Sequence, residues 1–500
     1  MNTSYAITAV ALVALATLGI GALGLRLSRT TGDFYVASRS VSPLLNSSAI
    51  SGEYLSAASF LGIAGLIVAF GADMLWYPIG WTAGYLLLLV FVAAPLRRSG
   101  AYTIPDFAEV RLQSATVRRA ASLLVVAIGW LYLLPQFQGA GLVLGAVTGA
   151  PSWVGVLLVS SIVVINVVSG GMRSITFVQA FQYWLKVTAL LIPLIFLVRA
   201  WMVDGSPGPE APASWTFPLF SADGAGLYTT YSVLIATFLG TMGLPHVVVR
   251  FYTNPDGGAA RRTTLIVLAL LGMFYLMPTL YGVLGRIYAS DLIASGRTDV
   301  VVIELPGRVI GGGLGDVLAA LLTAGAFAAF LSTSSGLTMS IAGVIGQDLV
   351  GSRFGSRFTG ISAVRLSAVV CVVVPVAIAL SAQRLSVANS VTFAFALAAS
   401  TFCPLLVLGI WWRGLTPIGA MAGLVGGGLA AMSAAAWTIV HAPGGWWGVL
   451  LGQPAAWSVP IGFALMVGVS LATRKRIPST VSRTMVRLHT PERLRVRRDA

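Results

Sequence analysis

The stretch NSSAISGEYLSAASFLG, residues 46–62, places serines, a glycine and Glu53 inside a segment that is otherwise apolar enough for lipid. A second stretch, AGAFAAFLSTSSG at 324–336, carries four hydroxyl residues in a row at 332–335. Polar or irregular backbone at membrane depth is tolerated where it is buried in protein or lines a cavity. Small and hydroxyl residues also suit close packing between membrane helices. Together the two stretches nevertheless indicate a site inside a membrane protein.

The composition of the whole chain agrees with a membrane protein. Of its 500 residues 57% are hydrophobic and only 9% are charged, and the mean hydropathy is +0.88. A soluble globular protein carries roughly a quarter charged residues, so this chain lacks the polar surface to face water. A membrane helix needs about 20 apolar residues, which leaves little room for a separate catalytic domain. We expect an all-α polytopic membrane protein.

Apolar segments of membrane length predict about thirteen transmembrane helices. They lie near residues 5–25, 43–70, 74–96, 119–148, 152–169, 176–199, 226–249, 264–288, 314–346, 361–381, 386–411, 416–440 and 457–472. The first segment has no basic residue before it and is predicted to be a retained span, not a cleaved signal.

The basic residues predict the orientation. With the N-terminus outside, 25 of the 31 lysines and arginines fall in cytoplasmic loops or in the C-terminal tail, as the positive-inside rule requires. The tail, residues 473–500, is basic, and its expected partner is the anionic headgroups of membrane lipid. Although the net charge is +15, the basic residues do not form one patch, so no nucleic-acid partner is expected.

The cysteines and histidines argue against a metal-dependent enzyme. Cys371 and Cys403 lie far apart in apolar runs, and the three histidines, His246, His441 and His489, are scattered. A zinc site needs clustered ligands. Glu53 and Lys186 are the ionisable residues at membrane depth, and neither is accompanied by a motif of nucleophile and base. We therefore predict that the chain is not an enzyme.

Several motifs resemble the sodium:solute symporter family, and within it the acetate and short-monocarboxylate permeases. They are TGDFYVASRSVSP (31–43), SGEYLSAASFLGIAGL (51–66), GAYTIPDFAEVRL (100–112), SGGMRSITFVQAFQ (169–182), GLPHVVVRFYT (243–253) and AFAAFLSTSSGLTMSIAGVIGQDL (326–349). Their order and spacing agree with the family across nearly the whole chain.

This resemblance implies a leucine-transporter-type core of two five-helix inverted repeats, with substrate bound between them. The repeats would occupy about 43–199 and 226–411, within a transmembrane domain of residues 1–472. The family's sodium site falls on the carbonyls of Ser47, Ile50 and Ala329 and on the hydroxyls of Ser332 and Thr333. Sodium would be a co-transported ion, and no organic cofactor is implied.

Lys186 and Gln179 are possible coupling residues. Many family members carry an aspartate in the sixth span, where this chain has Phe177, Val178 and Gln179. Lys186 lies about two turns further on. It either snorkels or pairs with a carbonyl, or it is a tethered ammonium near the sodium site, which would favour proton coupling.

The expected substrate pocket is aromatic and poor in acids and amides. The family pattern places its wall at Gly52, Tyr54, Tyr77, Trp81, Thr237, Thr241 and Phe393. A sugar would need many hydrogen-bonding side chains, because each buried unpaired group costs roughly 1–3 kcal/mol. A small carboxylate needs few donors, and the N–H groups after the break in the second span, at Ser51 and Gly52, are candidates. We expect Glu53 to be a structural hydrogen bonder. We expect His246 to be satisfied and Arg250 to be interfacial, and the alternative is that these two residues contact the substrate on its exit.

The sequence thus predicts sodium-coupled symport of a small anionic substrate of the acetate, propionate or pyruvate class. A proton-coupled monocarboxylate permease and a sodium-coupled amino-acid or pantothenate symporter are the alternatives. The expected location is the inner (plasma) membrane of a bacterium, because arginine outnumbers lysine 29 to 2, as in GC-rich bacterial genomes.

Overall fold

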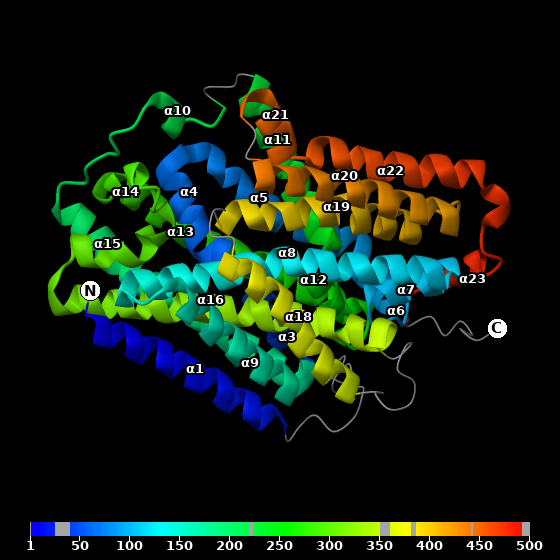
Figure 1. The fold of residues 1–500 in the computed structure, drawn as a ribbon, viewed down its shortest axis with the longest axis horizontal. Coiled ribbons are helices and arrows are strands. Elements are labelled where there is room, and N and C mark those ends of the chain that lie inside the picture. The colour runs from blue at the N-terminus through cyan, green and yellow to red at the C-terminus, as the bar shows by residue number, and fades with distance from the viewer. Residues whose placement is uncertain are drawn as a thin grey trace.

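The structure is a computed structural model that describes residues 2–25, 41–219, 224–350, 361–381, 387–441 and 444–492. The elements in these ranges are helices, most of them aligned with the long axis of the molecule, and the start of α1 and the C-terminal helix α23 lie at opposite ends of that axis (Figure 1). The first ten residues of the motif at 31–43 and the tail residues after Glu492 lie outside the described residues. The all-helical fold class is confirmed.

Eleven helical stretches of the described part are long and apolar enough to cross a membrane. Nine of them hold one span each: α1 (Thr3–Leu25), α8 (Ala115–Thr148), α11 (Gly224–Gly243), α13 (Gly257–Tyr288), α16 (Gly312–Val344), α18 (Ile361–Ser381), α19 (Val387–Trp411), α20 (Pro417–His441) and α22 (Ala455–Ala472).

The other two stretches hold two predicted spans each, which accounts for the thirteen. α9 (Ser152–Val203) has 52 residues, more than twice the length that one crossing needs. It is interrupted at Gly171, whose φ of 63° and ψ of −174° suit only glycine. The stretch Ala58–Arg98 turns at Gly71, which also has a positive φ, 77°.

That turn at Gly71 joins the second and third predicted spans. The elements on its two sides are η2 (Ala58–Gly62), α4 (Ile63–Phe70), η3 (Gly71–Leu75), α5 (Trp76–Leu87), η4 (Leu88–Val92) and α6 (Ala93–Arg98).

The second predicted span is broken, as the sequence indicates, but later along the chain. α3 (Pro43–Tyr54) is a continuous helix, started by Pro43 at its first turn and capped by the Ser42 side chain. The helix ends where Leu55 leaves the helical region, with ψ of 86°. Helical structure resumes at Ala57 and continues as the π-helical turn η2. The break therefore lies at residues 55–56, and the serines before it are helical.

The seventh predicted span is broken too. α11 ends at Gly243, Leu244 is extended with ψ of 119°, and Pro245 begins the short helix α12 (Pro245–Val249). Proline has no N–H group to donate, so it suits the first turn of a helix and ends the preceding one. The 3-10 turn η5 (Arg250–Thr253) follows.

Close backbone contacts bring the core helices together. α16 packs against α9, α8, α1 and α3, and α11 packs against α19 and α5. A Cβ atom at Gly240 of α11 would lie 2.5 Å from the carbonyl oxygen of Phe395 in α19. Only glycine allows this approach, which is the small-residue packing typical of membrane helices. α20 and α22 form a pair at one edge of the molecule (Figure 1).

Short elements close the two ends of the bundle. The end that holds the start of α1, here called the N face, carries α10 (Ala213–Thr216), α14 (Asp291–Ala294), η6 (Thr298–Val300), α15 (Val301–Val309) and α21 (Gly445–Gly452). The opposite end, the C face, carries α7 (Ile104–Leu112), η7 (Ile345–Val350), η9 (Arg474–Arg476) and α23 (Val481–His489).

Part of the predicted tail is folded onto the C face. α23 packs against α6 and α7, and its Met485 and Leu488 are buried. This part of the sequence is basic and poor in apolar residues. Its two buried apolar residues are three positions apart, so they share one face of the helix, and that face lies against the protein.

Candidate functional site

The two broken spans meet in the interior through a buried ion pair. Glu53, near the end of α3, accepts a hydrogen bond of 2.7 Å from Nε of Arg250, which follows α12, and the two side chains are 2% and 1% exposed. Arg250 also donates to the Thr176 hydroxyl at 2.9 Å and to the side-chain oxygen of Gln179. The expectation of an interfacial Arg250 is therefore wrong, whereas Glu53 is the structural hydrogen bonder expected from the sequence.

Lys186 reaches the end of α3 from the second half of α9. Its ammonium group donates to the carbonyl oxygens of Gly52 at 2.5 Å and Leu55 at 2.7 Å, and to the hydroxyl of Ser332 in α16 at 3.0 Å. The side chain is fully buried. Helix-end carbonyls without intrahelical partners carry partial negative charge, so this junction suits a monovalent cation. Lys186 pairs with carbonyls and does not snorkel.

The hydroxyls predicted for the sodium site face the end of α3. Thr333 donates to the carbonyl of Glu53 at 2.6 Å, and Ser332 donates to the carbonyl of Ala329, one turn earlier in α16, at 3.1 Å. Ser332, Thr333 and Ala329 are fully buried, within a continuous helix. The oxygens that meet at Lys186 thus come from the last turn of α3 and from α16.

Ser47 and Ile50, the other two residues of the predicted sodium site, lie inside α3. Both are buried, and the Ser47 hydroxyl donates to the carbonyl of Leu44 in its own helix at 2.9 Å. Ser51 and Gly52 are helical as well, so their N–H groups belong to the helix and are not free donors for an anion.

Gln179 joins the ion pair to the cation site. Its amide nitrogen donates to the carbonyl of Ser332 at 2.8 Å, and its oxygen accepts from Arg250. A Cβ atom at Gly52 would lie 2.2 Å from the Gln179 carbonyl oxygen, so α3 and α9 touch here. The side chain of Gln179 therefore connects the oxygens around Lys186 to the Glu53–Arg250 pair.

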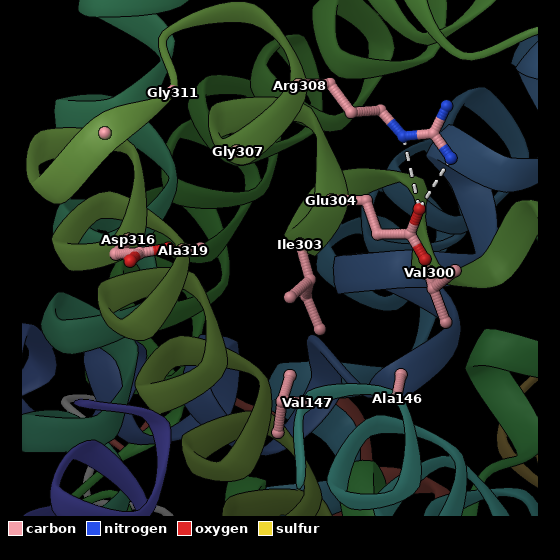
Figure 2. A pocket seen from close by; sticks show the side chains of 11 residues that line it. Ala146, Val147, Val300, Ile303, Glu304, Gly307, Arg308, Gly311, Asp316 and Ala319 are labelled. Carbon is pink, nitrogen blue, oxygen red and sulfur yellow. Dashed lines mark hydrogen bonds and ion pairs between the residues drawn. The ribbon is translucent and has the colours of Figure 1, made fainter. Parts of the chain in front are cut away.

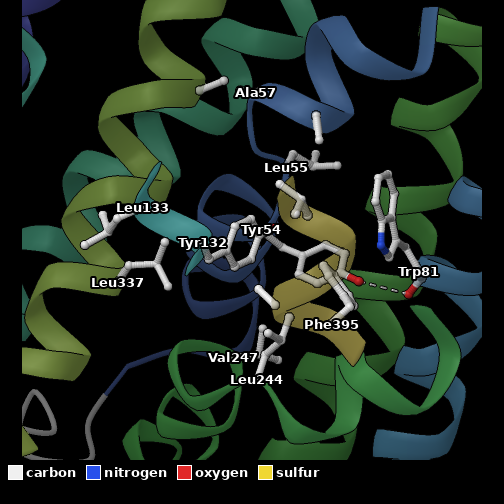
Figure 3. Packing of buried hydrophobic residues seen from close by; sticks show 14 of the residues in the cluster. Tyr54, Leu55, Ala57, Trp81, Tyr132, Leu133, Leu244, Val247, Leu337 and Phe395 are labelled. Atoms are coloured by element: carbon white, nitrogen blue, oxygen red, sulfur yellow. Dashed lines mark hydrogen bonds between the residues drawn. The ribbon is translucent and has the colours of Figure 1, made fainter. Parts of the chain in front are cut away.

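On the other side of α3, aromatic rings fill the centre of the molecule. Tyr54 lies edge-on to Tyr85 at 4.9 Å between centroids, and Trp81 lies 5.8 Å from Phe395, which is itself 5.8 Å from Tyr132. Figure 3 shows Tyr54, Trp81, Tyr132 and Phe395 gathered above Leu244 and Val247 of the second break. Sites for small ligands are commonly lined by such aromatic side chains.

Most predicted substrate residues border these rings. The hydroxyls of Tyr54 and Thr241 are 2.7 Å apart, and Thr241 lies one turn after Thr237, whose carbonyl accepts its hydrogen bond. Tyr77 lies 5.6 Å from Trp81 between ring centroids, and its hydroxyl is 3.5 Å from that of Thr392.

Gly52 and Phe393 stand apart from this group. Gly52 lies on the opposite side of α3, against α9, and Phe393 is buried in α19 two residues before Phe395.

His246 in α12 is fully buried, and neither of its ring nitrogens has a hydrogen-bond partner among the described residues. Its ring lies 5.2 Å from that of Tyr132. The expectation of a satisfied histidine is therefore wrong.

A separate cavity of about 480 Å³ opens at the N face, between α8, α15 and α16. Figure 2 shows Glu304 and Arg308, which form an ion pair at 2.8 Å, on one wall and Asp316 on the other. None of the predicted site residues lines this cavity. The site at the two breaks is thus distinct from it.

Two helix breaks that enclose a buried polar site are the architecture of secondary transporters. The sequence model of the sodium:solute symporter family matches residues 34–427, and the chain belongs to this family. The family and the fold make the chain a membrane transporter and not an enzyme.

Two relatives match over most of their length. The chain is 32% identical to an uncharacterized symporter, YwcA, of Bacillus subtilis, over 98% of this chain and 99% of that one. It is 30% identical to the monocarboxylic acid transporter of Corynebacterium glutamicum, over 88% of this chain and 86% of the relative.

Solved transporters share the fold. A Na⁺-coupled sialic acid symporter, solved in a substrate-bound outward-open state, matches with a TM-score of 0.70 at 16% identity, over 93% of this chain and 98% of that chain. MhsT, solved with L-phenylalanine, matches with a TM-score of 0.54 at 16% identity, over 85% of this chain and 98% of that chain. The leucine-transporter-type fold is confirmed.

The sequence analysis missed three features of the site. It did not place Arg250 in the interior, and it did not include Tyr85 or Tyr132 in the aromatic cluster. One signal could have indicated Arg250. Pro245 interrupts an apolar span five residues before it, so Arg250 lies close to a helix break, as Glu53 does.

Proposed function

We propose that this chain is a symporter that carries a small monocarboxylate into the cell together with a sodium ion. The observation that carries the proposal is the cation site between the end of α3 and α16, where two carbonyls and a hydroxyl bind an ammonium group. Sodium, like ammonium, is a monovalent cation that binds neutral oxygens. Membership of the sodium:solute symporter family supports sodium as the coupling ion.

The charges of the interior favour an anionic substrate. Among the described residues around the breaks, the buried lysine, arginine and carboxylate side chains are Lys186, Arg250 and Glu53, two cationic and one anionic when ionised. These groups leave one positive charge in excess when all three are ionised. Unbalanced charge in a medium of low dielectric constant is costly, so a carboxylate would be stabilised there. The relative from Corynebacterium glutamicum, named a monocarboxylic acid transporter, supports the same substrate class.

The aromatic cluster favours a short substrate. Tyr54, Trp81 and Phe395 are at most 2% exposed, so solvent does not reach these rings in this conformation. Acetate, propionate and pyruvate present a carboxylate and a small apolar remainder, which such a wall accommodates. Uptake then requires the two proposed repeats, about 43–199 and 226–411, to rock against each other and open the site to one side at a time.

Proton coupling is the second candidate, and Lys186 favours it. In this structure the lysine ammonium already occupies the carbonyls of Gly52 and Leu55 and the hydroxyl of Ser332. A sodium ion that uses these oxygens must displace it. If instead Lys186 takes up and releases a proton during the cycle, the lysine itself is the coupling group.

Uptake into proteoliposomes distinguishes the two candidates. The purified full-length chain is tested with radiolabelled acetate, propionate, pyruvate and proline, under an inward sodium gradient at equal pH and under a pH gradient without sodium. Sodium coupling predicts uptake in the first condition, lost in Ser332→Ala/Thr333→Ala and retained in Thr323→Ala, whose hydroxyl bonds only within the same helix. Uptake driven by pH alone and abolished by Lys186→Met would favour the proton mechanism, and preference for proline would overturn the substrate class.

The orientation belongs to the proposal as well. The N face would lie outside the cell and the C face in the cytoplasm of a bacterium, with the basic residues of the tail near anionic lipid. The arginines of α23 and of the C-face ends of the spans support this arrangement.

A further inference from the structure

His246 is a buried side chain whose hydrogen-bonding capacity is unused. It is fully inaccessible to solvent, and both ring nitrogens lack a partner among the described residues. Each unpaired polar group in such a place costs roughly 1–3 kcal/mol, so a structural role alone leaves the position unexplained. A group that binds a ligand in another step of a cycle explains it.

The position of His246 is central to the site. It is the second residue of α12, directly after the break in the seventh span, and α12 packs against α3, α8 and α16. Its ring lies 5.2 Å from the ring of Tyr132, edge-on at 66°. Tyr132 in turn lies 5.8 Å from Phe395, and Phe395 lies 5.8 Å from Trp81. A row of rings thus runs from the imidazole into the aromatic cluster, of which Figure 3 shows Tyr132, Phe395 and Trp81.

Arg250, the other cationic candidate on this segment, is already engaged. Its nitrogens donate to Glu53, Thr176 and Gln179. These bonds use three of the five N–H groups of the guanidinium, and a carboxylate that drew this group toward itself would leave Glu53 without its partner, which is costly in a buried site. His246 has no bond to break, and an imidazole always has at least one N–H donor.

We infer that His246 binds the carboxylate group of the substrate and that Tyr132, Phe395 and Trp81 form the wall for the carbon chain. The inference rests on the proposed function, since it assigns the residues that recognise a monocarboxylate. His246 then contacts the group that all monocarboxylates share, whereas the rings contact the part that differs between them. The two roles have different kinetic consequences.

Transport kinetics test this division. His246→Leu, which has no hydrogen-bond donor, is expected to raise KM for acetate, propionate and butyrate by a similar factor, about 10- to 100-fold for the loss of one hydrogen bond to a charged group, with little change in the maximal rate. Phe395→Ala is expected to change the ratio of the KM values for acetate and butyrate. His441→Leu, at an exposed histidine at the end of α20, is the matched control and is expected to leave KM unchanged.

The outcomes separate the inference from the proposed function. If the wild-type protein transports none of these acids, the proposed function fails. If the wild type transports them and KM of His246→Leu stays within about twofold for each, the carboxylate is bound elsewhere and only the inference is overturned. A large KM change confined to one acid also overturns it, because the carboxylate is common to all three.

A spectroscopic measurement keeps the inference testable if the His246 variants do not fold. The chain has three histidines, so His441→Asn/His489→Asn leaves His246 as the single one. In that protein, purified and labelled with ¹⁵N-histidine, saturating acetate is expected to shift the ring nitrogen signals, while methyl acetate, which has no charge, is not. Unchanged signals in a preparation that still transports acetate would refute direct binding.

Discussion

Arg250 and Glu53 place opposite charges at the ends of two broken helices, and each depends on the other. Removing one partner of a buried pair leaves an uncompensated charge, which destabilises a protein by about 3–5 kcal/mol. Arg250→Met is therefore expected to lower the melting temperature of the purified protein by many degrees. Glu53→Leu/Arg250→Met is expected to recover much of the loss, because no lone charge remains.

Arg297 and Glu304 provide the control for that measurement. They form an ion pair at 3.1 Å at the N face, where Arg297 is 55% exposed. Exposed pairs are worth about 0–1 kcal/mol, so Arg297→Ala is expected to leave the melting temperature nearly unchanged. A similar decrease in melting temperature for Arg250→Met and Arg297→Ala would show that the buried Glu53–Arg250 pair contributes no more to stability than an exposed pair.

At the scale of helices, the contact of α3 with α9 depends on Gly52. A Cβ atom there would lie 2.2 Å from the carbonyl oxygen of Gln179, which belongs to a backbone and cannot rotate away. Gly52→Ala is expected to push α3 away from α9 and to separate Lys186 from the Gly52 carbonyl. The initial rate of uptake should fall about tenfold or more, which corresponds to about 1.4 kcal/mol in the barrier to transport.

Gly272 in α13 is the matched control, because a Cβ atom there would meet nothing within 4 Å. Gly272→Ala is expected to transport at the wild-type rate in the same proteoliposome assay. If Gly52→Ala also transports normally, the close approach of the two helices is not needed for the cycle.

The sequence predicted the helices well because each span is an apolar run of membrane length, and this signal is local. It also indicated that the second span is broken, but it placed the break at Ser51 and Gly52, whereas the structure keeps both helical and breaks at 55–56. A serine or glycine in a membrane span can serve close packing or irregular backbone, and only the neighbouring helices decide which. Gly52 serves packing, because a Cβ atom there would meet the Gln179 carbonyl of α9.

The site was harder to predict because its contacts join distant parts of the chain. Lys186 stands out in the sequence as a charge inside a span, but its carbonyl partners, Gly52 and Leu55, lie more than 130 residues away. The same holds for Arg250 and Glu53, separated by 197 residues. The spacing of residues on one helix, such as Ala329 to Ser332, was predictable; the helix opposite was not.

On the scale of the whole molecule, Glu492 links α23 to the helices α6 and α13 at the C face. Glu492, just after α23, forms an ion pair with Arg98 of α6 at 3.2 Å and accepts a hydrogen bond of 2.9 Å from the Gly257 N–H at the start of α13. Partial burial alone would raise the pKa of Glu492, but these bonds outweigh it and lower the pKa below its usual value.

The docking of α23 is therefore expected to depend on pH. A carboxyl whose pKa is lowered by folding contributes stability above its unfolded pKa, roughly 4.3, and the contribution is lost as pH falls through the lower, folded value. Spin labels at Gln113→Cys and Ser482→Cys report the position of the helix by their distance. A narrow distance distribution at pH 7 should broaden in acid, and Glu492→Gln should be broad at both; an unchanged distribution in that variant would contradict the role of Glu492.

The charge that the whole protein moves in one cycle can be measured without knowing the coupling ion. One sodium ion or one proton carried with one monocarboxylate transfers no net charge, so the membrane potential should not affect accumulation. Each further cation would add about 2.3 kcal/mol per 100 mV, roughly a 50-fold change in the accumulation ratio. Proteoliposomes with a fixed cation gradient and a potential set by potassium and valinomycin give the answer. We expect equal accumulation of acetate at 0 and about −100 mV, since a single cation site at Lys186 balances a single carboxylate at the breaks; a large increase would require a second cation site elsewhere in the bundle.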